Sequence, residues 1–321
     1  MQVNPWTNII LDSSSASETW QNIFTQLQEL ALSSPSPVDL HNQTMVPDRL
    51  LAETAWELWT AYPLEAPKTS QVLQQWCQEA SHQGRAVLVL DAWSLRELPF
   101  LLGGAEVRGI VPVSVRVTGS EAPSDTDQFA RALGVPSRSH LKNNNPPAGF
   151  SLFGDKVYTD VPSLPFEDCV GHVPHETNLF LWHTWLDDLI HVHKKQPDQI
   201  TNMASTVLQS DGFWQLVDRL RQGRRLIITA DHGYAVSRFF ATEEDPEVKA
   251  ALRDAFGGSR SIKATTPWQE KFMPPHVTTV NDFHLVIGQR KWSVPSGFPH
   301  ICHGGLSLLE VAVPFVELPP L

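Results

Sequence analysis

Apolar residues recur at helical spacing near the start of the chain. Between Trp20 and Leu30 they fall three or four residues apart, so they share one face of a helix. Ser15 precedes this run and Glu18 stands three residues after Ser15, a pair that resembles a capping box. The pattern therefore predicts an amphipathic helix that begins near Ser15.

Two further helices are expected before residue 84. The first spans residue 47 to about residue 62, and the second spans residue 70 to about residue 82. Gly84 follows the second helix in the position where glycine commonly closes a helix. We interpret residues 1–84 as a helical accessory segment.

The hydrophobic pattern changes at residue 85. The run AVLVLD, residues 86–91, is continuously apolar and ends in an acid, which is typical of a buried parallel strand. Further strands are predicted at residues 109–117, 226–230, 283–288 and 310–316, and helical patterns lie between them at residues 128–133, 178–193 and 213–221. Strands that alternate with helices predict an α/β sheet.

Residues 243–280 interrupt this alternation. The stretch is polar and contains the segment GGSRS, so it is expected to form a helix followed by an excursion over the surface. Insertions of this length often border active sites.

Composition narrows the class of protein. With 41% hydrophobic residues the chain can bury a sizeable core, and its net charge of -11 argues against a broadly basic surface that would hold nucleic acid by phosphate contacts alone. The three cysteines have no paired spacing, which excludes a disulfide framework and a thiolate zinc knuckle. No signal peptide or membrane span is recognisable, so we expect a soluble, cytoplasmic protein without a membrane partner.

Candidate chemistry begins at two predicted strand ends. Asp91 ends the first strand, and Asp231 and His232 follow the run LIITA. Open α/β sheets bind ligands at the carboxyl ends of their strands. Gly233 allows the chain to leave regular structure there, so that two successive side chains can reach one metal ion. A lone acid at a strand end is more often a turn or cap residue.

A second pair of metal-binding residue types occurs in the predicted helix 178–193. Asp187 and His191 stand four residues apart and project from one face, and His183 is expected one turn earlier on that face. Asp188 and His193 are five apart and form the poorer chelating pair. The alternative is a set of partly solvated residues opposite an apolar stripe.

Histidines also occur near the carboxyl terminus. His303 precedes Gly304 and Gly305, which would let the backbone pass close to a ligand. His300 follows a proline and is expected to be exposed. His303 is therefore the better ligand candidate, with a turn histidine bonded to a carbonyl as the alternative.

Hydroxyl groups that could act as a nucleophile gather before the helix expected at residues 128–133. Thr126 lies near the first turn of that helix, where amide N–H groups and the helix dipole would favour an alkoxide. Capping of the helix is the ordinary role of such residues. Substitutes for Thr126 are Ser124, Ser120, Thr118 and, more weakly, Ser94.

Five segments occur in the order of a known family: Asp91, APSDT, Asp187 with His191, ADHG, and HGGLSLLEVAVP. In this order the chain resembles a PglZ domain, of the alkaline phosphatase superfamily, over roughly residues 85–321. The resemblance implies a three-layer αβα sandwich with a mostly parallel sheet. It also implies two divalent metal ions, Zn²⁺ or Mn²⁺.

The resemblance assigns a role to each candidate residue. It implies one metal held by Asp91, Asp231, His232 and the Thr126 oxygen, and a second held by Asp187, His191 and His303. In-line attack by Thr126 would then give a phosphothreonine intermediate that is hydrolysed. The nucleophile segment departs from the family pattern, because relatives commonly place two hydroxyl residues around a small apolar residue where this chain has Ser-Asp-Thr.

The resemblance implies a phosphodiesterase or nuclease that acts on nucleotides or on single-stranded nucleic acid, with partner proteins in phage defence or bacterial signalling. Arg260, Lys263 and Lys271 form a basic stretch that would meet a phosphate backbone. A solvated loop is the more common use of such residues. The different-class alternative is a scaffold or binding module with weak or no turnover.

Overall fold

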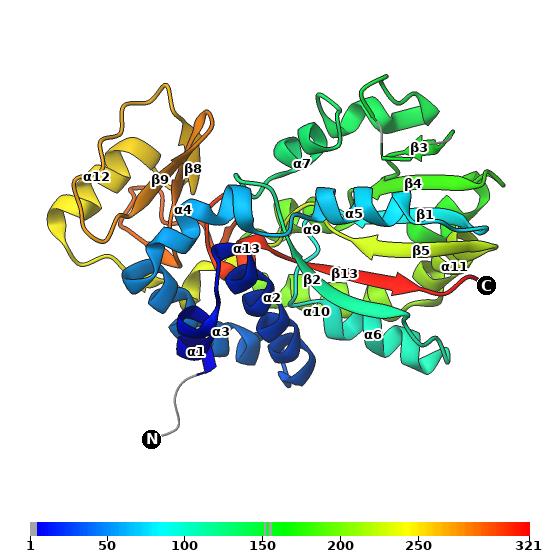
Figure 1. The fold of residues 1–321 in the computed structure, drawn as a ribbon, viewed down its shortest axis with the longest axis horizontal. Helices are drawn as coiled ribbons and strands as arrows, with labels where there is room; N and C mark the ends of the chain where they lie inside the picture. Colours follow the sequence, from blue (N-terminus) through cyan, green and yellow to red (C-terminus); the bar gives the residue numbers. More distant parts are fainter. Residues whose placement is uncertain (1–4, 151, 154–155) are drawn as a thin grey trace.

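The computed structural model describes residues 5–150, 152–153 and 156–321. Its centre is a six-stranded sheet in the order β2, β13, β5, β1, β4 and β3 (Figure 1). The strands are β1 (Gly84–Leu90), β2 (Ser114–Gly119), β3 (Tyr158–Asp160), β4 (Asn178–His183), β5 (Arg224–Thr229) and β13 (Ala312–Leu318). β13 runs antiparallel to both of its neighbours, and β5, β1, β4 and β3 pair in parallel.

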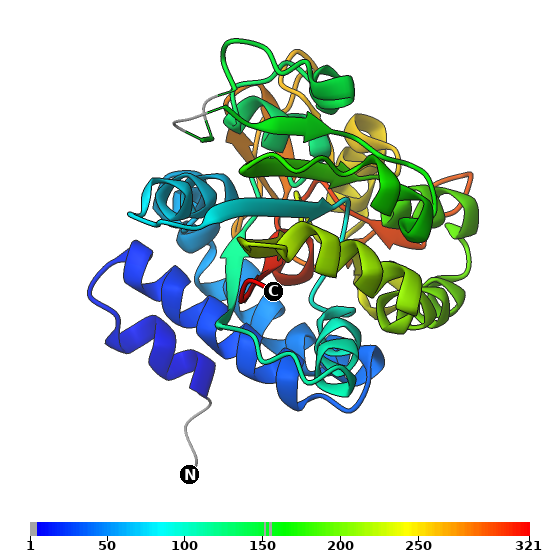
Figure 2. The same ribbon diagram turned by 90° about the vertical axis from the view of Figure 1, so that its right-hand side faces the viewer.

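Helices cover both faces of this sheet (Figure 2). One face carries α5 (Thr69–Gln78) and α7 (Thr126–Ala132), whose side chains pack on Val87 and Val89. The other face packs on Leu88 and Leu90 and carries α2 (Ala16–Ser33), α6 (Leu98–Val107), α9 (Trp185–His193), α10 (Pro197–Gln209) and α11 (Asp211–Arg221). Alternate residues of one strand thus enter two cores, which explains the unbroken apolar runs. The predicted α/β class, with a mostly parallel sheet between two helical layers, is confirmed.

The first predicted helix start is confirmed. Ser15 caps α2 and its hydroxyl accepts from the Glu18 amide at 3.2 Å. The Glu18 carboxylate reaches back to the Ser14 amide at 2.7 Å, one residue earlier than in a standard capping box. Side chains of α2 pack in the same hydrophobic core as Leu88 and Leu90 of β1. The division of the chain at residue 84 stays a prediction.

The next two predicted helices have other bounds. The segment holds α3 (Pro37–Thr54) and α4 (Trp56–Glu65), so Pro47 lies inside a helix rather than at its start. Gly84 does not close a helix: α5 ends at Gln78, and Gly84 is the first residue of β1. A side chain there would place its Cβ 2.3 Å from the Thr177 carbonyl oxygen, so the strand pair requires glycine.

The stretch predicted as one helix over residues 178–193 is wrong in its first half. Residues NLFLWH form the fully buried strand β4, and only Trp185–His193 form the helix α9. A continuous apolar run does not distinguish a buried strand from a buried helix. His183 therefore ends a strand and does not share a face with Asp187 and His191.

His183 is instead a neutral core residue. Its Nε2–H donates to the Leu164 carbonyl at 2.9 Å, its Nδ1 accepts from the Trp185 amide at 3.1 Å, and its ring stacks on Phe166. Burial lowers the pKa of His183 to about 4. Both ring nitrogens are thus committed to the neutral form.

We expect His183 to weaken the fold in acid. The folded state binds fewer protons than the unfolded state between the depressed pKa and the ordinary value near 6.5, so stability present above about pH 6.5 is lost as the pH falls toward 4. At pH 5 this costs about 2 kcal/mol. In urea titrations, His183→Gln should lose less stability between pH 7 and pH 5 than the wild type, whereas the exposed His82→Gln should match it. Equal losses of unfolding free energy in the wild type and both variants would contradict the interpretation of His183 as a buried, neutral residue.

The interruption at residues 243–280 contains the predicted helix, α12 (Pro246–Phe256). The rest is more ordered than expected, because β8 (Ser261–Lys263) and β9 (Val277–Val280) flank β10 (Phe283–Val286) in a separate antiparallel sheet. Figure 1 shows this unit at one end of the molecule, beyond the carboxyl edge of the central strands. The strand predicted at residues 283–288 belongs to this small sheet.

Smaller shifts occur at two other predicted strands. Gly109 lies in a turn with a positive φ of 68°, and the strand expected from residue 109 begins at Ser114. The strand expected from residue 310 follows a helical turn, α13 (Leu308–Val311), and begins at Ala312. Among the described residues, no helix combines the length and the apolar character that crossing a bilayer requires.

Candidate metal centre

The register of two parallel strands brings Asp91 and Asp231 together. β1 and β5 pair with Val89 opposite Thr229, so each aspartate stands two residues beyond a matched pair. Donor atoms of Asp91, Asp231 and His232 lie within 4.8 Å of one another, and all three residues are buried. The grouping expected from the strand ends is therefore present in the structure.

The turn after β1 fixes one of these carboxylates. Asp231 Oδ1 accepts from the Ala92 amide at 2.9 Å, and Ala92 adopts a positive φ of 62°. Asp91 Oδ2, by contrast, is buried, and its partner among the described residues is the guanidinium of Arg138. Two buried carboxylates at one point need compensating positive charge, and Arg138 pairs with one of the two.

Thr126 faces the same carboxylates. It is the first residue of α7, and its hydroxyl donates to Asp231 Oδ2 at 2.8 Å and lies 3.3 Å from Asp91 Oδ1. Capping of α7 is done by its neighbour Asp125, whose carboxylate accepts from the Gln128 amide at 2.8 Å. The Thr126 hydroxyl is thus not used as the helix cap.

The substitute hydroxyls are engaged elsewhere. Ser124 Oγ donates to the Gly305 carbonyl and accepts from the Gly304 amide, and Ser94 Oγ donates to Glu97. Ser120 donates to the Glu121 carbonyl, and Thr118 shares a hydrogen bond with Thr69. Among the candidate hydroxyls, Thr126 is the one aimed at the carboxylate pair.

Asp187 and His191 lie on α9 as predicted, at the solvent side of the cluster. Asp187 Oδ2 is 3.4 Å from His191 Nε2, with the Asp187 side chain 17% exposed and that of His191 70% exposed. Burial raises the pKa of Asp187, and the neighbouring His191 and His232 lower it. Asp187 is thus the more buried member of the Asp187–His191 pair.

His303 approaches from the opposite end of the chain. Its ring stacks on His232 with centroids 4.6 Å apart, and burial lowers its pKa to about 4. His303 Nδ1 is buried without a hydrogen-bond partner in the described part of the chain. A ring nitrogen that carries no proton and has no hydrogen-bond partner is able to bind a metal ion. His300 is exposed, as expected.

The second set of predicted ligands is less closely gathered than the first. Asp187, His191 and His303 do not meet within 4.8 Å among the described residues, where Asp91, Asp231 and His232 form the one such group. His303 is linked to the first set by its stack on His232, and Asp187 and His191 contact each other on α9.

Arg138 was not identified from the sequence. Its guanidinium contacts Asp91 Oδ2, and its side chain is 25% exposed. The residue begins the 3₁₀ helix Arg138–Asn144, in a region where the sequence carries no motif. A planar set of donors at the cluster mouth suits recognition of a phosphate or carboxylate.

Glu97 and Tyr234 form a second unpredicted contact. The Tyr234 hydroxyl donates to Glu97 Oε1 at 2.7 Å, and both side chains are fully buried. Tyr234 stands two residues after His232, and Glu97 lies in the loop after Asp91. The hydrogen bond ties together the two loops that carry the cluster.

The glycines around His303 are required by close approaches. Gly304 has a positive φ of 92°, and a Cβ on Gly305 would lie 2.8 Å from Arg260 Nε. Gly233 has a comparable constraint, because a Cβ there would lie 2.5 Å from the Leu309 carbonyl oxygen. The backbone positions of both histidine loops thus depend on residues without side chains.

Arg260 does not belong to an exposed basic stretch, so that prediction is wrong for this residue. It is buried, and it donates to both Glu310 oxygens at 3.1 and 2.8 Å and to the Gly288 carbonyl at 2.7 Å. Glu310 also accepts from the Gly305 amide at 3.2 Å. The ion pair connects the small sheet to the loop after His303.

Breaking this ion pair should destabilise the fold strongly. Glu310→Ala leaves the Arg260 charge buried and unpaired, for which we expect a loss of about 3–5 kcal/mol in the free energy of unfolding. The double variant Arg260→Met with Glu310→Leu removes both charges and should recover most of that loss. Urea denaturation measures both. A single variant as stable as the wild type would contradict the buried pair.

No protein-family model matches the chain, and no curated protein matches it. Among solved structures it is similar to murine ectonucleotide pyrophosphatase/phosphodiesterase 5, with 16% identity and a TM-score of 0.43 over 74% of this chain and 88% of that chain. The human counterpart gives 14% and 0.42 over the same shares. Phosphonoacetate hydrolase from Sinorhizobium meliloti 1021 gives 14% and 0.39 over 75% of this chain and 91% of that chain. Identities and TM-scores this low do not assign an activity to the chain.

Proposed function

We propose that this chain is a two-metal phosphoester hydrolase that uses Thr126 as its nucleophile. The observation that carries the proposal is the Thr126 hydroxyl, 2.8 Å from Asp231 and 3.3 Å from Asp91 at a buried Asp–Asp–His cluster. A hydroxyl held against two carboxylates of such a cluster is suited to serve as a metal-activated nucleophile.

The residues fit two divalent ions. Asp91, Asp231, His232 and the Thr126 oxygen would hold one ion, and Asp187, His191 and His303 would hold the second. The buried His303 Nδ1 supports this set, because it has no hydrogen-bond partner among the described residues. The first set also holds two buried carboxylates, of which Asp91 alone has an arginine partner in the described part of the chain. Carboxylate and imidazole ligands suit Zn²⁺ or Mn²⁺. Bound ions would neutralise charge on the phosphoryl oxygens.

The protein residues then perform distinct tasks. Asp231 orients the Thr126 hydroxyl, whose oxygen attacks phosphorus in line with the leaving group and forms a phosphothreonine. The bond from phosphorus to the leaving-group oxygen breaks, and the leaving group departs as an alcohol with the proton that Thr126 has lost. Arg138, beside Asp91, would bind a non-bridging phosphoryl oxygen through its guanidinium. Water then cleaves the P–O bond to Thr126, which regenerates the hydroxyl and releases phosphate or a monoester.

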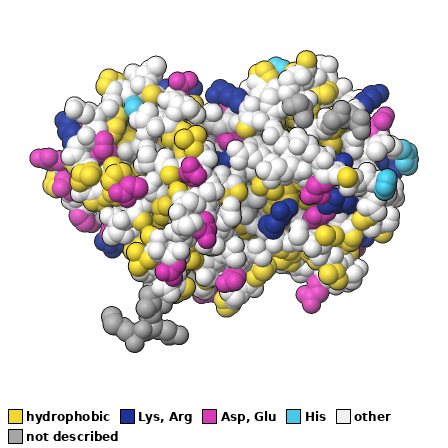
Figure 3. Space-filling view, viewed as in Figure 1, with side chains coloured by type: hydrophobic (Ala, Val, Ile, Leu, Met, Phe, Trp, Pro, Cys, Tyr) yellow, Lys and Arg dark blue, Asp and Glu magenta, His cyan; other side chains and the backbone are white. Residues whose placement is uncertain are grey.

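Phosphodiesters of nucleotides or oligonucleotides are the substrate class that we propose, in a cytoplasmic protein with partners in phage defence or signalling. This part of the proposal rests on the resemblance to PglZ domains. Figure 3 shows basic side chains scattered among acidic ones on the face in view, rather than gathered in one patch. Recognition of a phosphate would therefore depend on the metal centre and on local cations.

The alternative is a binding scaffold with little turnover. The observation in its favour is that the second ligand set does not meet within the spacing of the first. Against the scaffold, the chain contains every ligand residue that the proposed mechanism needs. It also contains the Thr126 hydroxyl, which is not used as a helix cap.

The proposal is tested with bis-p-nitrophenyl phosphate and p-nitrophenyl phosphate as diester and monoester probes. We expect the purified protein to hydrolyse the diester, a chelator to abolish the reaction, and added Zn²⁺ or Mn²⁺ to restore it. Absence of metal-dependent hydrolysis of both esters would leave the scaffold as the better explanation.

A further inference from the structure

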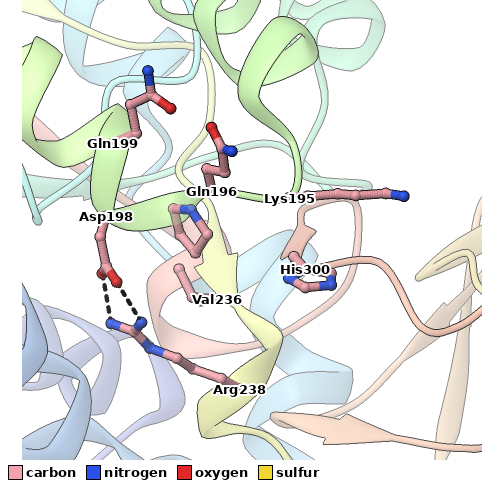
Figure 4. Close-up of a pocket in the computed structure, with 8 residues that line it drawn as sticks. Lys195, Gln196, Asp198, Gln199, Val236, Arg238 and His300 are labelled. Atoms are coloured by element: carbon pink, nitrogen blue, oxygen red, sulfur yellow. Dashed lines mark hydrogen bonds and ion pairs between the residues drawn. The ribbon is translucent and has the colours of Figure 1, made fainter.

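A pocket of about 520 Å³ lies at the start of α10, beside Val236 and His300 (Figure 4). The turn between α9 and α10 forms one wall with Lys195, Gln196 and Asp198, and the opposite wall carries Arg238 and His300. None of the proposed metal ligands or the nucleophile lines it. The pocket is thus separate from the reacting atoms.

Three chain segments lead from the metal centre to this pocket. Lys195 follows His191 by four residues, Val236 follows His232 by four, and His300 precedes His303 by three. The last two segments are paired as β6 (Ala235–Val236) and β12 (Ile301–Cys302), with the Ser237 amide bonded to the His300 carbonyl at 2.9 Å. Three or four residues of chain span at most about 10–14 Å, so Val236 and His300 lie within that distance of His232 and His303 along the backbone.

Only one of the two cationic side chains that line the pocket has an acidic partner in the part of the chain that the structure describes. Arg238 is neutralised by Asp198 through two contacts of 2.8 and 2.9 Å, which Figure 4 marks with dashed lines. Lys195 has no ion pair or hydrogen bond with the described residues, and Figure 4 shows its side chain running past His300, away from the Arg238–Asp198 pair. On a chain with a net charge of -11, the lining therefore keeps one uncompensated positive charge.

We propose that this pocket binds a second phosphate group of the substrate, with Lys195 and His300 as its contacts. The inference rests on the proposed function and names its substrate class more closely: an ester that carries another phosphate about one nucleotide unit from the bond that is cut. Lys195 supplies the positive charge, and the His300 ring supplies a hydrogen-bond donor. The Arg238–Asp198 pair joins the two walls.

Three substrates test this subsite: a thymidine dinucleotide, the same dinucleotide with a terminal 3′-phosphate, and the trinucleotide. We expect a lower KM for the two substrates that have a second phosphate. Lys195→Glu should raise the KM of these two substrates about tenfold relative to that of the plain dinucleotide. Lys194→Glu is the matched control, because Lys194 is an exposed neighbour that does not line the pocket. If Lys195→Glu raises the KM of the 3′-phosphorylated dinucleotide alone, the pocket binds the terminal phosphate. If it raises the KM of the trinucleotide alone, the pocket binds the second internal phosphate.

A binding measurement keeps this test separate from catalysis. Thymidine 3′,5′-bisphosphate should bind to the chelator-treated wild type and to Lys194→Glu about tenfold more tightly than to Lys195→Glu. Hydrolysis without any effect of Lys195→Glu on the KM ratios or on this affinity overturns the subsite and leaves the proposed function intact. If no ester is hydrolysed, the proposed function fails, and the affinity difference alone decides whether the pocket binds phosphate.

Discussion

Thr126→Ala is expected to lower turnover of bis-p-nitrophenyl phosphate on the order of 10⁴-fold, because it deletes the attacking oxygen. The metal content should change little, since three side chains of the same cluster remain. Stability should also be largely kept, because Asp125 rather than Thr126 caps α7. Steady-state kinetics and elemental analysis of the same preparation measure the two effects together.

Thr126→Ser is the matched control, since it retains the hydroxyl and loses a methyl group. It should keep most of the turnover that Thr126→Ala loses. Mass spectrometry of the acid-quenched wild type should find phosphate on the peptide that contains Thr126. Full activity in Thr126→Ala would move the nucleophile to another group, and Ser124, which is 0% exposed and bonded to the His303 loop, would be the next to test.

Asp231→Asn is expected to lower turnover by at least about 10³-fold and to remove metal from the site. The substitution keeps an oxygen that can accept from the Ala92 amide, so the local backbone should hold. It removes one of two buried carboxylates. The metal-free variant should therefore melt at a higher temperature than the metal-free wild type, while added Zn²⁺ should stabilise the wild type more.

Asp188→Asn is the control for that substitution. Asp188 is exposed on the same helix as Asp187 and accepts from the Thr184 hydroxyl at 2.6 Å, away from the cluster. We expect its metal content and turnover to match the wild type. A scaffold without metal would instead show the same melting temperature with and without Zn²⁺ in all three proteins.

The sequence predicted the centre of the site better than its surroundings. Asp91, Asp231 and His232 follow short apolar runs, and parallel pairing of those runs necessarily brings their ends together. Thr126 could be placed near a helix start, but its aim at Asp231 depends on Asp125 taking the cap. Which of the two neighbours caps the helix and which faces Asp231 is decided by the tertiary structure.

Other features could not be obtained from local pattern. The run before His183 is apolar throughout, so period alone left strand and helix undecided. Arg260 stands in a polar stretch and is nevertheless buried, because its partner Glu310 lies 50 residues away. Arg138 reaches Asp91 from a loop without regular spacing. In each case the deciding contact joins residues that are distant in the sequence.

The most direct measurement is the metal content of the purified wild-type protein by elemental mass spectrometry. Two bound ions of Zn²⁺ or Mn²⁺ per chain are predicted, with at least one lost in Asp231→Asn and none lost in Asp188→Asn. A wild-type protein that holds neither metal after equilibration with both, and whose metal content Asp231→Asn does not change, would contradict the metal centre.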